Sequence, residues 1–174
     1  MNIDNLKQLL PEFAKDIKLN LSSIMQEDAE LSANQVIGIA LASAYATKHA
    51  IVIQHIEAQA KELLAAEYIE AAKAAATIMA MNNVYYRFLQ LVEDDNYKQL
   101  PARLRMNIIA NPGIDKVDFE LYSLAVSAIN ACGTCVKAHA NVIEKAGITP
   151  VGIQNTVRIA AVINAAAQAL AISE

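Results

Sequence analysis

The chain has 174 residues, of which 55% are hydrophobic but only 5% are aromatic, so alanine and other small aliphatic residues supply most of the apolar content. Alanine is the best helix former, and five glycines and four prolines are too few for the turns of a many-stranded sheet. These features predict a single all-α domain over residues 1–174, a helical bundle. The formal net charge of −4 and the absence of a basic stripe argue against a nucleic-acid partner.

Two further observations concern membranes and export. The most apolar stretch, residues 159–172, is interrupted by Asn164 and Gln168 and is shorter than the roughly 20 residues that a membrane span needs. The first residues contain Asp4 and lack the basic start and apolar run of a secretory signal. We therefore expect a cytoplasmic protein that has no membrane partner.

The first predicted elements are short helices within residues 2–30. The second of these should begin near Pro11, because Phe13, Ile17 and Leu21 recur at a spacing of four residues and would share one helix face. This face is expected to pack on the core.

A longer helix is predicted to begin after Ser32. Ser32 and Gln35 have the spacing of a capping box and precede an apolar run. The β-branched segment 50–53 could be mistaken for a strand, but its helical flanks and the lack of turn signals favour a buried helix. Glu57 and Lys61 then form a favourable pair four residues apart.

The middle of the chain predicts two helices, one over about 67–81 and a shorter one over 85–92. Met79 in the first of them is interpreted as a packing residue. The polar run 93–96 is the best loop in this half, and the Asn-Pro-Gly sequence at 111–113 is the next strong helix breaker.

The last third predicts three helices. Asp115 or Asp118 can cap a helix that ends at about Asn130. The Cys-x-x-Cys segment then opens a helix that stops at Gly147, and Thr149 caps the final helix.

The chain also has a faint internal repeat, roughly 32–92 and 115–172. A shift of 84 residues aligns His55 with His139 and brings alanine-rich segments together. Two copies of one helical unit, packed about a pseudo-twofold axis, would explain this pattern. Only the second copy contains cysteines, and His55 is therefore interpreted as a core or boundary histidine.

The two cysteines, Cys132 and Cys135, are the strongest functional signal. A structural disulfide is not expected in a protein without an export signal, so the pair is better interpreted as redox-active or metal-binding. Their spacing lets the two sulfurs meet across one turn, and a helix N-terminus lowers the pKa of a thiol. Zinc could use both cysteines with His139, but it would need a fourth ligand or water.

Two titratable residues accompany the cysteines. His139 lies four residues after Cys135, so it shares that helix face and can take or return a proton near neutral pH. Glu120 lies twelve residues before Cys132 on the preceding helix, among apolar residues. It is either a proton-shuttling carboxylate or an ordinary glutamate that favours the helix dipole.

These residues resemble a known family. The spacing of the glutamate, the cysteine pair and the histidine is similar to that of the alkyl hydroperoxidase D (AhpD) family, within the carboxymuconolactone decarboxylase-like superfamily. Three other segments strengthen the resemblance: residues 10–21, residues 81–88 and the Ala-Gly-Ile-Thr sequence at 146–149. The likeness thus covers nearly the whole chain.

The resemblance implies an all-helical, internally duplicated fold assembled as a homotrimer. It also implies a thiol-dependent peroxidase and disulfide reductase in antioxidant defence, which reduces alkyl hydroperoxides, regenerates a partner peroxiredoxin (AhpC), or does both. Electrons would come from dihydrolipoamide carried by a 2-oxoacid dehydrogenase component and re-reduced by dihydrolipoamide dehydrogenase. No tightly bound cofactor and no metal are expected.

Residue roles follow from the same resemblance. Cys135 would be the peroxidatic cysteine that becomes a sulfenic acid, and Cys132 would be the resolving cysteine and proton donor. Glu120 and His139 would relay protons. The better-known members have a histidine directly before the second cysteine, whereas this chain has Thr134, which cannot titrate near neutral pH.

Two alternatives remain at this point. The chain could be a non-redox, oligomeric binding protein that keeps only the fold, or a lactone decarboxylase of the same superfamily. The intact Glu120, cysteine pair and His139 argue against the first, and the paired thiols argue against the second.

Overall fold

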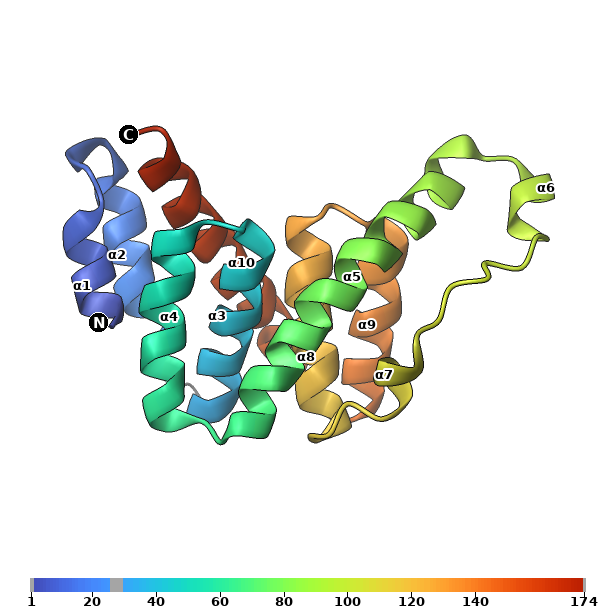
Figure 1. The fold of residues 1–174 in the computed structure, drawn as a ribbon, viewed down its shortest axis with the longest axis horizontal. Coiled ribbons are helices and arrows are strands. Elements are labelled where there is room, and N and C mark those ends of the chain that lie inside the picture. The colour runs from blue at the N-terminus through green and yellow to red at the C-terminus, as the bar shows by residue number, and fades with distance from the viewer. Residues whose placement is uncertain (1, 26–29, 174) are drawn as a thin grey trace.

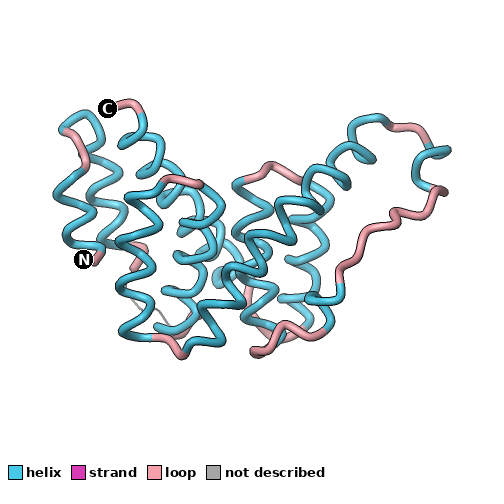
Figure 2. The backbone as a smooth tube through the Cα atoms, viewed as in Figure 1, coloured by secondary structure: helices cyan, strands magenta, loops and turns pink. Residues whose placement is uncertain are grey.

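The computed structural model describes residues 2–25 and 30–173, and these residues form helices with no strand among them (Figures 1 and 2). Most connections are short, but residues 99–106 form an extended connection between two of the helices. The predicted all-α fold is confirmed. The helices are α1 (Ile3–Leu9), α2 (Lys15–Ser23), α3 (Ala33–Thr47), α4 (Ala50–Leu63), α5 (Ala66–Val92), α6 (Asp95–Lys98), α7 (Asn107–Ala110), α8 (Lys116–Ile129), α9 (Gly133–Lys145) and α10 (Pro150–Ala171), with a 3-10 turn at Glu12–Ala14.

Helices α3 and α8 form the centre of the molecule. Each packs against the other and against α5 and α10, while α4 lies on α3 and α9 lies on α8. The middle of each of these two central helices, residues 36–44 in α3 and 119–127 in α8, is buried around its whole circumference. Gly38 of α3 lies against the Tyr122 ring of α8, where any Cβ atom would overlap the phenol group. The two central helices therefore approach closely because position 38 has no side chain.

Several predicted helix starts are confirmed by their caps. Ser32 and Gln35 form the capping box of α3. The side chain of Asp115 accepts from the backbone of Val117 at the start of α8, and Thr149 caps α10. Gln35 Nε2 also donates to Asp118 Oδ1 at 2.8 Å, so the capping box of α3 contacts the first turn of α8.

The prediction for the N-terminal region is only partly right. Leu21 is buried, but the Phe13 side chain is 66% exposed. The segment Glu12–Ala14 is a 3-10 turn and α2 begins only at Lys15, so the period of 3.6 residues does not run from Phe13 to Leu21. The part of that prediction that concerns residues 26–29 lies outside the described residues.

The predicted break near residues 82–84 is wrong, because α5 is one continuous helix of 27 residues. Asparagine competes with the helix when its side chain bonds to its own backbone. Here the Asn83 side chain is bound to Ser127 and Asn130 instead, on α8 and just beyond its end. The predicted loop at 93–96 is shorter than expected, since Glu93 ends α5 in the left-handed region and α6 begins at Asp95.

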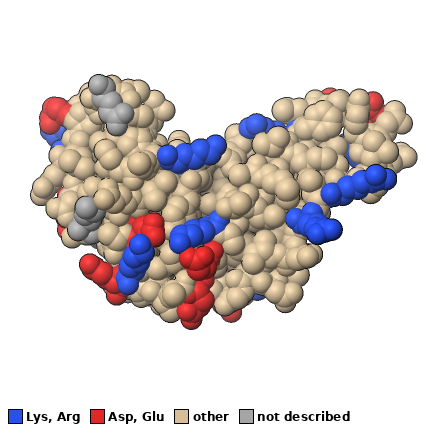
Figure 3. Space-filling model, in the orientation of Figure 1, with Lys and Arg blue, Asp and Glu red and all other residues tan. Residues whose placement is uncertain are grey.

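Helix α5 crosses the molecule and extends beyond it (Figure 1). We define residues 84–106, which comprise the C-terminal part of α5, α6 and the chain that returns to α7, as the arm; the end of α5, α6 and part of the returning chain stand away from the packed helices. On the face drawn in Figure 3, charged side chains are scattered and most of the surface is uncharged. None of the described helices is long and apolar enough to span a membrane.

Candidate functional site

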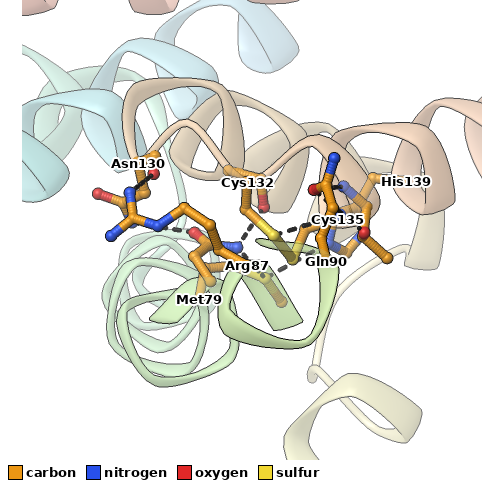
Figure 4. The surroundings of a disulfide bond; sticks show 10 residues. Met79, Arg87, Gln90, Asn130, Cys132, Cys135 and His139 are labelled. Atoms are coloured by element: carbon orange, nitrogen blue, oxygen red, sulfur yellow. Dashed lines mark hydrogen bonds between the residues drawn. A yellow bond between two sulfur atoms is a disulfide. The ribbon is translucent and has the colours of Figure 1, made fainter. Parts of the chain in front are cut away.

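The cysteine pair lies where α8 ends and α9 begins. Ala131 adopts the left-handed conformation, with φ of 54°, and turns the chain into Cys132, which is the N-cap of α9. Cys132 and Cys135 form a disulfide across the first turn, with their Cα atoms 5.3 Å apart (Figure 4). The Cys135 backbone N–H points at Cys132 Sγ at 3.4 Å, so the helix N-terminus faces this sulfur.

The two sulfurs differ in access. Cys132 is fully buried, whereas Cys135 is 6% exposed and lines a pocket. An incoming reagent therefore meets Cys135 first.

The pocket has a volume of about 250 Å³ and lies between α5, α7 and α9. Its lining is mainly apolar and consists of Met79, Asn82, Tyr86, Met106, Ile109, Thr134, Cys135, Ala138 and His139. Cys135 and His139 thus open into the same space, as their spacing on one helix face predicts. The volume is below the roughly 300–1,000 Å³ of pockets for drug-sized ligands, so the pocket suits a slender molecule.

Glu120 and His139 meet directly. Glu120, at 5% exposure on α8, has its Oε2 atom 2.6 Å from Nδ1 of His139 on α9. A carboxylate can only accept, so Nδ1 carries the proton and the ring is held in one orientation. The other ring nitrogen, Nε2, lies 3.3 Å from Met79 Sδ on α5. Met79 therefore contacts His139 in the site in addition to packing in the core. Only the packing role was predicted from the sequence.

Thr134 is held by α5. Both its backbone N–H and its hydroxyl donate to Gln90 Oε1, at 3.2 and 3.3 Å. The Gln90 amide lies over Gly133, where a Cβ atom would be 3.1 Å from it. Gln90 thus fixes the first turn of α9, and no local sequence signal could have identified it.

A polar network supports the turn that precedes Cys132. Asn83 donates to Ser127 Oγ at 2.9 Å and accepts from Asn130 at 2.9 Å, while Arg87 donates to the Asn130 carbonyl. Ser127 also accepts from the backbone N–H of Cys132 at 3.1 Å through its carbonyl. The turn is therefore held from α5 on one side and from α8 on the other.

The remaining histidine interpreted from the sequence, His55, has the surroundings of a structural residue. His55 is largely buried, and its Nδ1 contacts the Ile51 carbonyl at 2.9 Å within α4, as expected for a core histidine. Within residues 2–25 and 30–173, no three His, Cys, Asp or Glu side chains are grouped so that they could hold a metal ion.

Comparison with known proteins places this helical, cysteine-bearing chain in a class. A family model described as "Carboxymuconolactone decarboxylase family" matches residues 95–174, which include α8, α9 and the cysteine pair. Proteins named "Alkyl hydroperoxide reductase AhpD" are similar over nearly their whole length. The protein from Coxiella burnetii is 56% identical over 95% of both chains. That from Azorhizobium caulinodans is 53% identical over 98% of this chain and 93% of its own. That from Brucella suis is 54% identical over 98% and 97%.

The chain therefore belongs to the AhpD family, which confirms the resemblance seen in the sequence.

Proposed function

We propose that the chain is a thiol-dependent alkyl hydroperoxide reductase whose reactive centre is the Cys132–Cys135 pair. One observation carries the proposal: Cys135 and His139 open into the same apolar pocket, and His139 is held there by buried Glu120. The pocket offers a nucleophile, a proton-transfer group and room for an alkyl chain. The names of the relatives support the same activity.

In the oxidative half of the reaction, the Cys135 thiolate attacks the terminal oxygen of the hydroperoxide. The O–O bond breaks, the alcohol leaves with a proton from the His139–Glu120 pair, and Cys135 becomes a sulfenic acid. The Cys132 sulfur then attacks Cys135 and displaces the hydroxyl as water, which leaves the disulfide. Cys132 is the resolving cysteine and a proton donor in this scheme, because the proton of its thiol leaves with the hydroxyl as water.

In the reductive half, a dithiol restores the pair. One thiolate of the dithiol attacks Cys135 Sγ, the disulfide breaks, and Cys132 leaves as a thiolate. The second thiol of the reductant attacks its own sulfur in this mixed disulfide, which frees Cys135 and forms a cyclic disulfide. Two electrons and two protons pass to the protein. The reductant is dihydrolipoamide, carried by a 2-oxoacid dehydrogenase component and regenerated by dihydrolipoamide dehydrogenase.

The reduced pair would also serve a protein partner. A dithiol held in one turn can pass its two electrons to the disulfide of an AhpC-type peroxiredoxin by the same exchange steps. The exposed first turn of α9, where Gly133 and Thr134 lie at the surface beside Cys135, supports such contact. Both partners are expected in the cytoplasm.

The assembly proposed with this function is a homotrimer. The arm carries large apolar side chains that are exposed in the single chain: Val84, Phe88, Leu91, Tyr97 and Leu100. Exposed apolar patches of this kind are typical of protein contacts. Burial of the arm against neighbouring copies would remove them from water.

A coupled assay tests the proposed function. Peroxide consumption is measured with dihydrolipoamide and dihydrolipoamide dehydrogenase, with and without an AhpC-type peroxiredoxin. We expect turnover without the peroxiredoxin and faster turnover with it. Mass measurement after mild peroxide should show the loss of two hydrogens, reversed by a dithiol. No peroxide consumption in either assay and no reversible mass change would favour a binding protein or a decarboxylase.

A further inference from the structure

The sulfur of Met79 faces the nitrogen of the His139 ring that Glu120 does not bind. Met79 Sδ, on α5, lies 3.3 Å from His139 Nε2, and the residue is 1% exposed, so packing holds the thioether against the ring. Asn83 Nδ2 also approaches the same sulfur, from 4.0 Å. A thioether has no hydrogen to donate, so both contacts give this sulfur the role of an acceptor.

An acceptor at this place restricts the protonation of the ring. The contact between Nε2 and the sulfur is favourable only when Nε2 carries a hydrogen. Nδ1 already carries one, which it donates to Glu120 Oε2 at 2.6 Å. A ring with hydrogen on both nitrogens is the imidazolium, so Glu120 and Met79 together match the charged form of His139.

Packing alone does not require sulfur at position 79. Leucine and methionine have similar volumes and replace one another in protein cores at little cost. A carboxylate in place of the thioether would form a stronger, charge-assisted hydrogen bond and would keep the proton. A weak acceptor orients the Nε2–H group and still lets its proton pass to an oxygen in the pocket.

The other elements around the ring add little charge to it. The pocket lining includes one further titratable side chain, Tyr86 of α5, besides Cys135 of the disulfide, and α7 contributes only apolar side chains to it. Helix α10 also contacts α9, and its one ionisable residue, Arg158, forms hydrogen bonds within its own helix. Glu120 and Met79 are therefore the groups that select the protonated form of the ring.

We propose that Met79 is a positioning residue whose sulfur accepts a hydrogen bond from Nε2–H of His139. It thereby retains, on the imidazolium, the proton that the ring gives to the leaving alcohol. The use of that proton in turnover rests on the proposed function, whereas the hydrogen bond itself can be tested without any substrate.

The first test observes the ring in the oxidised protein with isotope-labelled histidine. Hydrogen–nitrogen correlation spectra from about pH 5 to pH 9 show whether Nε2 carries a proton, and the signals missing from His139→Phe identify the residue. We expect Nε2 to lose its proton at a pH about 0.5–1 unit lower in Met79→Leu than in the wild type, because one hydrogen bond to the charged form is gone. Equal midpoints would overturn the proposal.

The second test looks for the same displacement in turnover. The alkaline limb of kcat with an alkyl hydroperoxide and dihydrolipoamide, where His139 has lost its proton, should move to lower pH by the same amount in Met79→Leu. A kcat that is lower at every pH, with the limb in its place, would assign Met79 to packing alone and would overturn the proposal.

Met81→Leu is the matched control, because it makes the same exchange on the same helix. Met81 is half-buried and does not line the pocket. We expect the wild-type midpoint for Nε2 and the wild-type pH profile of kcat. An equal displacement in Met81→Leu would trace the effect to the packing of α5 and would contradict the role of the Met79 sulfur.

A further measurement needs no substitution, and it decides the question if Met79→Leu is unstable. In protein grown with selenomethionine, selenium replaces the sulfur of all five methionines. One selenium resonance should shift with pH at the midpoint found for His139 Nε2, because the hydrogen bond to residue 79 forms and breaks there. If no selenium resonance follows that midpoint, the proposal is wrong.

The outcomes separate the two proposals. A wild type that reduces no peroxide would overturn the proposed function, and with it the use of the proton in turnover. An active wild type whose Nε2 midpoint is the same in Met79→Leu would overturn the role of Met79 alone.

Discussion

Glu120 and His139 are joined by a hydrogen bond of 2.6 Å between two largely buried groups, on consecutive helices. The contact holds the imidazole ring beside the pocket that Cys135 lines. A carboxylate in this position stabilises an imidazolium when the ring takes up a proton. The pair is therefore suited to accept the proton of a thiol and to return it to a leaving oxygen.

We predict that Glu120→Gln and His139→Phe each lower turnover with dihydrolipoamide and peroxide by about 10²–10⁴-fold, the usual cost of losing a general acid or base. The fold should survive, because neither residue fills a large apolar volume. Thr134→Val should have a much smaller effect, since Thr134 does not titrate in this range. Steady-state rates and circular dichroism make the comparison, and near-normal turnover in both relay variants would mean that the helix N-terminus activates the cysteines alone.

The residues on α8 and α9 could be predicted from the sequence, because helix spacing relates Cys132, Cys135 and His139 directly. Glu120 could only be suspected, since its direction depends on how two helices cross. Met79 and Asn82 were inaccessible to such reasoning. They reach the pocket from α5, some forty to sixty residues away, and contacts at that distance leave no periodic signal.

At the level of helices, the start of α8 is tied to the start of α3. Asp118 accepts from Gln35 at 2.8 Å, and burial raises the pKa of Asp118 above its ordinary value, although the Gln35 hydrogen bond opposes this. In the folded protein the carboxyl group thus takes up its proton at a higher pH than in the unfolded chain. Its contribution to stability is complete below the ordinary pKa and is lost as the pH rises through the raised value.

Asp118→Asn should remove that pH dependence. The amide oxygen can still accept from Gln35, and no charge has to be buried. We expect the free energy of unfolding of the variant to increase relative to that of the wild type as the pH rises from about 3 to 7. Urea unfolding of both proteins across this range measures the difference, and a constant difference would show that Asp118 titrates alike in the folded and unfolded states.

The close approach of α3 and α8 gives a second prediction for helices. Gly38→Ala would force a methyl group into the Tyr122 ring, so the helices must move apart. Overpacking of this kind typically costs about 1–3 kcal/mol. Gly38→Ala combined with Tyr122→Leu should recover part of the loss. Chemical denaturation measures both, and an undiminished stability of Gly38→Ala would mean that the two helices are not held at this distance.

The presence of most of the longer helices could be predicted, because helix caps and helix breakers are local features of the sequence. Ser32, Asp115 and Thr149 each marked a start that the structure confirms. The clearest error concerned α5, for which the sequence predicted two helices, over about 67–81 and 85–92, in place of one. Tertiary hydrogen bonds to Asn83 compensate for its low helix propensity, and such contacts are not written in the local sequence.

For the molecule as a whole, the packing of a single chain does not explain why the arm exposes large apolar side chains. Leu91 is 73% exposed there, and the neighbouring apolar side chains of the arm share its exposure. The family resemblance implied a homotrimer without locating its contacts. The internal repeat also stays a prediction, since helix order alone does not test it.

We predict a trimer at micromolar concentration, which Leu91→Asp or Phe88→Glu should dissociate. A charge placed in a buried apolar contact loses its hydration without gaining a partner. Light scattering coupled to size exclusion gives the mass of each protein. Lys98→Ala, on the same arm but exposed and paired with Asp95, is the control and should leave the mass unchanged. A monomeric wild type would refute the prediction.

Cys132 is enclosed, yet it stays beside any adduct formed on Cys135. A monothiol such as glutathione that opened the disulfide would leave Cys132 as a thiolate, one turn away and at a high effective concentration. Cys132 would then expel it and close the ring again before a second monothiol arrived. A reductant with two thiols escapes this reversal because its own second sulfur is equally near. The geometry of the pair therefore selects against the abundant monothiols of the cell, without any contact that recognises them.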